Sequence, residues 1–181
     1  MPRPARLPRL AEVGDPTDPR GFAVLLPEHL TWLRVHNYSE RTVPYREKTL
    51  LHFALWCLER GVNRPADVTQ PILERYQRHL YHHRKKDGQA LAFTTQLARL
   101  VPVRTFFKWL ARERLVLYNP AAELELPRVP FRLPGVVLSH AEVERILSLP
   151  DVRTPSGLRD RAILETLYST AIRRLELVYL K

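Results

Sequence analysis

Apolar residues recur at helical spacing in several separate stretches of the chain, and no stretch alternates apolar and polar residues as a half-buried strand does. The pattern therefore predicts an all-α protein. Four helices are expected within residues 22–123, at about 27–36, 39–61, 69–83 and 93–114. Residues 137–181 carry two further helical stretches and the first turns of a third.

Residues that favour helix ends flank several of these stretches. Ser39 is a suitable N-cap for the second helix, and Gly61 is a suitable stop. Thr69 is followed by a proline in the first turn, as is typical of a helix start. Ser139 and Glu142 have the spacing of a capping box before the first helix of the C-terminal region.

The apolar stripes of the four N-terminal helices predict one shared core. Its expected members are Leu30, Leu33, Leu50, Phe53, Trp56, Cys57, Leu73, Tyr76, Leu80, Leu97, Leu100, Val103, Phe107 and Leu110, with Trp32 as a further candidate. The C-terminal region has only about 45 residues, which without a disulfide or metal is below the usual size of an independent domain. We therefore expect that region to be an incomplete domain with exposed apolar faces.

Proline-rich segments divide the chain. Residues 1–21 are rich in proline and predict a flexible tail. Four prolines between positions 120 and 134 interrupt the apolar period and predict an extended linker. The expected organisation is a tail at 1–21, a helical domain at 22–123, a linker at 124–136 and the incomplete domain at 137–181.

The net charge of +10 favours a polyanionic partner, with nucleic acid first. Residues 22–123 hold sixteen Lys and Arg against nine Asp and Glu, so most of the excess charge lies in the helical domain. No apolar stretch reaches the roughly 18 residues of a membrane span. A single cysteine excludes an internal disulfide framework and favours a reducing cytoplasm.

Polar side chains on the second and fourth helices are candidates for contact with double-stranded DNA, because they lie away from the apolar stripes. The candidates are Arg41 and Lys48 on the second helix and Thr94, Thr95, Gln96 and Arg99 on the fourth. The loop residues Arg84, Lys85 and Lys86 are candidates for phosphate contact. A solvated helix face or turn is an equally weighted alternative. His79, His82 and His83 have metal-compatible spacing but no evident fourth ligand, so no metal is expected.

Motifs along nearly the whole chain, from about residue 25 to residue 181, carry a resemblance to a known family. The stretches are YSERTV…LLHFALWCLERGV, LARLVPVRTFFKWLARERLVLYNPAAELELP and GLRDRAILETLYSTAIRRLELVYL. They resemble the tyrosine recombinases of the phage integrase, Xer-like family. The most specific match combines Arg159-Asp160, Thr170-Ala171-Ile172-Arg173 and Glu176-Leu177. The resemblance implies a SAM-like four-helix core-binding domain, a linker and the helical start of a catalytic domain.

The resemblance also implies a chemistry. Members of the family exchange DNA strands through a covalent phosphotyrosyl intermediate without a metal or other cofactor. Arg173 matches the first catalytic arginine, whose guanidinium would hold phosphate oxygens. The alternative for Arg173 is an ion pair with Glu176 at the start of a helix. Ala171 stands where the family has glycine, and an alanine with positive φ would be strained.

The other family groups have no match in the 181 residues: the lysine, the His-x-x-Arg pair, a later His or Trp, and the tyrosine nucleophile. Tyr179 is not assigned that role. The sequence therefore predicts a DNA-binding portion of a site-specific recombinase, ending just after the first catalytic arginine and inactive alone. Further recombinase subunits are a second expected class of partner. The alternatives are a half-enzyme completed by a separate polypeptide, or a helical protein-interaction module that does not bind DNA.

Overall fold

Helices account for all the regular structure in residues 13–130 and 137–180, which are the residues that the computed structural model describes. In the first half of the chain they are α1 (Phe22–Val35), α2 (Thr42–Leu58), the short 3₁₀ helix η2 (Pro65–Asp67), α3 (Gln70–His82) and α4 (Phe93–Arg112). The second half contains α5 (His140–Ser148), α6 (Pro155–Thr170) and α7 (Arg174–Val178). The predicted all-α class is confirmed for these residues.

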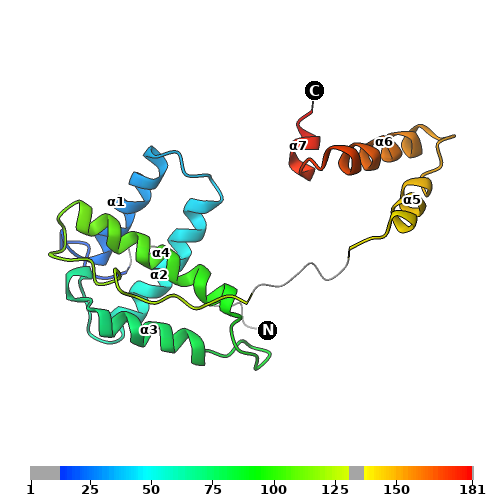
Figure 1. Ribbon diagram of the computed structural model, residues 1–181. Coiled ribbons are helices and arrows are strands. Elements are labelled where there is room, and N and C mark those ends of the chain that lie inside the picture. The colour runs from blue at the N-terminus through cyan, green and yellow to red at the C-terminus, as the bar shows by residue number, and fades with distance from the viewer. Residues whose placement is uncertain (1–12, 131–136, 181) are drawn as a thin grey trace, which may run out of the picture. The chain divides into compact units, whose positions relative to one another are not determined.

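The chain divides into two compact units, the first ending at Val129 and the second beginning at Pro130. Within the first unit, α2 packs against both α1 and α4, and α3 packs against α4 (Figure 1). Phe53 of α2 lies at the centre, with its ring edge-on to Phe22, Tyr76 and Phe107 at centroid distances of 6.2, 5.0 and 6.0 Å. Every predicted core residue is buried except Leu97 and the further candidate Trp32, which are both half-buried.

The helix ends follow capping rules with one shift in position. Gly61 follows α2 with φ +74°, and its N–H donates to the Leu58 carbonyl while Val62 donates to Cys57 (3.0 and 3.1 Å). This is the Schellman arrangement expected of a glycine stop. Ser39 is not the N-cap, because α2 begins at Thr42 after Arg41. The Ser39 hydroxyl nevertheless accepts a hydrogen bond from the Thr42 amide at 3.3 Å.

The predicted tail and linker boundaries need correction, because residues beyond each end of the predicted domain pack on the bundle. Val13 is buried in the core, and the Asp18 carboxylate pairs with Arg64 at 2.6 Å. After α4, the chain turns back and runs along the bundle (Figure 1), where Leu124 is buried. The Gln77 amide donates to the Glu125 carbonyl at 3.0 Å and fixes this returning segment.

The second unit has well-capped helices but few buried side chains. Ser139 and Glu142 form the predicted capping box, with the Ser139 amide donating to the Glu142 carboxylate at 2.8 Å. The Thr154 hydroxyl accepts from the Gly157 amide at the start of α6 (3.0 Å). Gly157 is the one buried residue among α5, α6 and α7 as the structure describes them. Leu149, Leu158 and other apolar residues are exposed there.

No helix among the described residues is both long and apolar enough to cross a membrane.

Candidate nucleic-acid interface

One face of α2 and its N-cap carries four polar or aromatic side chains in a row. Arg41, Tyr45, Lys48 and His52 are spaced by four, three and four residues, so they lie on the same side of the helix. This row includes both α2 residues that the sequence predicts as DNA contacts. Phe53 and the other apolar residues of α2 point into the core, so the row lies on the side of the helix that is accessible to a partner.

The start of α4 lies beside this row and is joined to it. The Tyr45 hydroxyl donates to the Ala98 carbonyl at 2.9 Å, which links α2 to α4. Thr94 and Thr95 are exposed in the first turn of α4, and Arg99 is half-buried one turn further along. The result is a shared surface built from two helices about fifty residues apart in the sequence.

A groove lies along the line where the two helices meet, and we call it the α2–α4 groove. Its lining residues are Tyr45, Lys48, Thr49, His52, Thr95 and Arg99. The structure therefore brings together three predicted contact residues, Lys48, Thr95 and Arg99, in one concave surface. Two cationic side chains and no acidic residue line this groove, an arrangement that favours an anionic group.

The charges around the groove also act on its histidine. Burial lowers the pKa of His52 below its usual value, and the positive charges of Arg99, Lys48 and His83 lower it further. His83 is the C-cap residue of α3, so groups from α2, α4 and the end of α3 all act on this imidazole. The groove is thus an electropositive site in which the histidine is held neutral.

The prediction that Gln96 contacts DNA is wrong, because its side chain is not at the surface. Its side chain is buried, with 3% of its surface exposed, and its amide nitrogen donates to the Leu91 carbonyl at 2.9 Å. The amide closes the turn that precedes α4, so it points into the protein. The sequence places Gln96 on a polar face because glutamine is usually exposed, but here a local hydrogen bond makes burial favourable.

The basic residues at 84–86 lie in a tight exposed turn between α3 and α4. The Lys85 amide donates to Gln89, and the Gly88 amide donates to Lys85, both at 2.9 Å. The Arg84 guanidinium donates to the Tyr81 carbonyl at 3.1 Å. Arg84, Lys85 and Lys86 do not line the α2–α4 groove, so this turn is a separate candidate contact.

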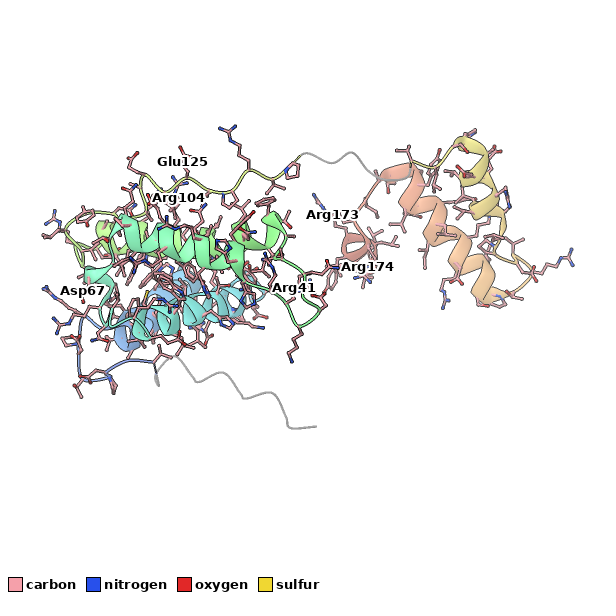
Figure 2. All side chains as sticks on the ribbon, turned by 90° about the horizontal axis from the view of Figure 1, so that it is seen from below. Arg41, Asp67, Arg104, Glu125, Arg173 and Arg174 are labelled. Atoms are coloured by element: carbon pink, nitrogen blue, oxygen red, sulfur yellow. The ribbon has the colours of Figure 1, made fainter. Side chains whose placement is uncertain are left out.

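Positive charge alone does not single out the interface. Arg75 and Arg78 are exposed on α3, and Lys108 is exposed on α4. Figure 2 shows Arg104 on the same side of the bundle as Glu125, and the Arg104 guanidinium approaches the Ala122 carbonyl at 3.4 Å. A second groove, between α3 and α4, is lined by Arg78 but also by Glu74. The α2–α4 groove differs from it in having two cationic side chains and no acidic residue in its lining.

Three groove residues, Tyr45, Thr49 and His52, were missed by the sequence reasoning. Thr49 is buried. Tyr45 and His52 are neither Lys nor Arg, so the choice of basic residues on α2 passes over them. Their spacing from Arg41 and Lys48 is the signal that could have found them, because it places all four on one face of α2.

Arg173 occupies the N-cap of α7 in the second unit. Its backbone N–H donates to Glu176 Oε2 at 2.8 Å, and its Nη1 donates to Glu176 Oε1 at 3.1 Å. The ion pair anticipated as the alternative to catalysis is therefore present. The side chain is still 87% exposed, and a guanidinium has five N–H donors, so Arg173 can bind a further oxyanion.

The turn before Arg173 is strained. Ala171 has φ +52° and ψ +24°, the left-handed conformation that glycine adopts easily and alanine does not. The Ala171 N–H donates to the Leu167 carbonyl at 3.0 Å, so the residue acts as the C-cap of α6.

In the described part of the chain, no cluster of three or more His, Cys, Asp or Glu has the geometry of a metal site. Cys57 is buried in the core, and burial raises the pKa of its thiol to about 12.

Comparison with known proteins identifies the family of the chain. Tyrosine recombinase XerC 2 of Ralstonia nicotianae is 52% identical over 162 residues, covering 88% of this chain and 47% of that protein. The chain belongs to the tyrosine recombinase family. Tyrosine recombinase XerC of Pelotomaculum thermopropionicum is 38% identical over 153 residues, covering 83% and 49%. This tyrosine recombinase chain thus spans about half the length of the curated relatives it matches.

The tyrosine recombinase chain was also compared with solved structures and with protein-family models. The N-terminal domain of a phage integrase/site-specific recombinase from Haloarcula marismortui matches 57% of this chain and 92% of its own, with 16% identity and a TM-score of 0.49. No protein-family model matches the chain.

Proposed function

We propose that this chain is the DNA-binding portion of a site-specific tyrosine recombinase, and that it grips duplex DNA with the α2–α4 groove. The observation that carries the proposal is the convergence of Lys48, Thr95 and Arg99 in one groove with no acidic lining residue. The Xer recombinases named above supply the class of reaction, which is site-specific DNA recombination. Further recombinase subunits are the proposed protein partners, and the cytoplasm is the proposed location.

The groove suits contact with the sugar-phosphate backbone. Lys48 and Arg99 offer charge-assisted hydrogen bonds to phosphate oxygens, and each neutralised phosphate releases counterions and strengthens binding. Thr94 and Thr95 at the start of α4 offer short hydroxyl donors at a helix N-terminus that has no side-chain cap, and the positive end of the helix dipole favours an anion there. Arg41 extends the same surface along α2. Backbone contacts of this kind position a protein on DNA, and base contacts from the same helix starts would add specificity.

Titration of duplex DNA into the 181-residue chain at two salt concentrations tests the proposal. Lys48→Gln and Arg99→Gln should each weaken binding severalfold and reduce the slope of log affinity against log salt by about 0.9, the contribution of one phosphate contact. Lys108→Gln and Arg75→Gln are matched controls, because they remove the same charges from exposed helix positions outside the groove. No binding at low salt would refute DNA binding and favour a protein-interaction module. Equal losses in all four variants would refute the groove.

Arg173 is proposed to contribute to the chemistry of recombination. In phosphoryl transfer, a guanidinium can hold two nonbridging oxygens and stabilise the charge that develops on them. The ion pair with Glu176 orients the Arg173 side chain, and its exposure leaves donors available. Because the chain has no match for the family's His-x-x-Arg pair or its tyrosine nucleophile, we expect it to bind DNA without forming a covalent adduct. A denaturing gel of chain and DNA checks this, and an adduct would contradict it.

A further inference from the structure

His52 is the one histidine that lines the α2–α4 groove in the described structure. It is half-buried on α2, one helical turn beyond Lys48. The charged and titratable groups that face it are Lys48 from its own helix, Arg99 from α4 and His83 from the end of α3. Tyr45 lines the same groove with its phenol hydrogen-bonded to Ala98. An imidazole in this position shares the groove with two cationic side chains, Lys48 and Arg99, and with no carboxylate.

The surroundings make the protonation state of His52 depend on what occupies the groove. In the free protein, burial and the neighbouring cations lower the pKa of His52, so the ring is neutral at pH 7. A phosphate that enters the groove brings negative charge and hydrogen-bond acceptors close to the same ring. Both effects favour the charged imidazolium and so raise the pKa.

We propose that His52 takes up one proton from solvent when a DNA phosphate enters the α2–α4 groove, and that the resulting imidazolium donates a hydrogen bond to a phosphate oxygen. This inference rests on the proposed DNA-binding function and specifies how the groove recognises its anion. The step makes and breaks no bond to phosphorus. Its only chemical change is transfer of a proton from the buffer to a ring nitrogen.

Proton uptake gives DNA binding a defined pH dependence. If the pKa of His52 is higher in the complex than in the free chain, affinity rises as pH falls through the pKa of the complex. It levels off below the pKa of the free chain. We expect about three- to tenfold tighter binding at about pH 6 than at about pH 8, the range over which one histidine can change its charge. The imidazolium also adds up to about 0.9 to the salt slope at the lower pH.

The experiment measures affinity of the 181-residue chain for a mixed-sequence duplex at both pH values and at two salt concentrations. His52→Gln should still bind but should lose both the pH dependence and the extra salt slope. His82→Gln is the matched control, since His82 is exposed near the end of α3 and does not line the groove. It should keep the full pH dependence. Circular dichroism of each variant at each pH checks that the helices remain folded.

The ring of His52 can be followed directly by NMR, which keeps the test independent of any folding defect in the variant. The pKa of His52 should rise when duplex DNA is added. An unchanged or lower pKa in the complex would overturn the proposal, as would a His52→Gln chain with the whole pH dependence intact. Binding without pH dependence in the unsubstituted chain would refute the role of His52 alone. If the chain does not bind DNA at the lower or at the higher pH, the result would instead refute the proposed function of the groove.

Discussion

His29 shows most clearly what a single residue imposes on this protein. It is 1% exposed, and neither ring nitrogen has a hydrogen-bond partner among the described residues. The imidazole packs against the rings of Trp32, Phe106 and Trp109 at centroid distances of 6.0, 5.3 and 5.0 Å. Burial, with smaller contributions from the charges of Arg46 and Arg112, lowers the pKa of His29 from 6.5 to about 4. The folded bundle therefore requires the neutral ring.

Acid should destabilise the bundle through His29. Between about pH 6.5 and about pH 4 the unfolded chain binds a proton that the folded chain excludes, so the free energy of unfolding falls as pH falls through this window. The loss from this one residue should reach roughly 3 kcal/mol. Urea unfolding at a series of pH values measures it. His29→Leu should remove most of this pH dependence, whereas His82→Gln should not; equal behaviour of the two variants would contradict the assignment.

Ala171 offers a second test at the level of one residue. Its left-handed backbone is unfavourable for alanine, so Ala171→Gly should stabilise the C-terminus of α6 by about 1 kcal/mol. Ala162→Gly is the opposite control, because Ala162 lies inside α6, where glycine is destabilising by about the same amount. Amide exchange of residues 167–173 should slow about fivefold in the first variant and accelerate in the second. Faster exchange in Ala171→Gly would show that the turn is not strained.

At the scale of the elements, the segment that follows α4 behaves as part of the bundle. Leu124 is 3% exposed, so Leu124→Ala should lower the free energy of unfolding by about 2–4 kcal/mol. Leu117→Ala is the matched control, because Leu117 is fully exposed in the preceding loop and its loss should change stability by less than about 0.5 kcal/mol. Urea unfolding of both variants makes the comparison. A small effect at both positions would restore the predicted linker boundary.

The sequence predicts the existence and core faces of the helices well, and their ends less evenly. For α3, Thr69 and the proline after Gln70 mark the start to within one residue. For α1, the sequence predicts a helix that begins at about residue 27, with Pro27 at its start. In the structure the helix begins at Phe22 and contains Pro27. Phe22, Leu25 and Leu26 are all buried, so packing of the added turn outweighs the preference of proline for the first position. Local capping signals cannot reveal such tertiary contributions.

At the scale of the whole molecule, the sequence finds three of the six residues that line the groove, Lys48, Thr95 and Arg99, but it cannot find the groove. Lys48 and Arg99 belong to helices whose mutual packing the apolar stripes do not specify, because each stripe fixes only which face turns inward. Charge likewise fails to separate Lys48 from Lys108, which is equally basic and equally helical. His52 escapes because its importance depends on three neighbours that the fold supplies. Contact between helices, rather than residue type, defines this site.

The two units should differ in stability. Amides of α2 and α4 should show protection close to global stability, because their side chains form the core. Amides of α5, α6 and α7 should exchange far faster, because Gly157 is the one buried residue that the structure describes in those helices. Native-state amide exchange measures both sets at once. Strong protection across 158–180 would show that the second unit is stable by itself.

The returning segment that ends at Val129 also has a mechanical consequence. Before the first unit ends at Val129, two contacts hold the segment to the bundle. Leu124 is buried in the core, and the Gln77 amide donates a hydrogen bond to the Glu125 carbonyl. Tension applied from the C-terminal side would therefore have to pull Leu124 out of the core and break the Gln77–Glu125 hydrogen bond before the force could act on α4. Such a load should thus act first on this anchored segment, before it acts on the contact between α2 and α4.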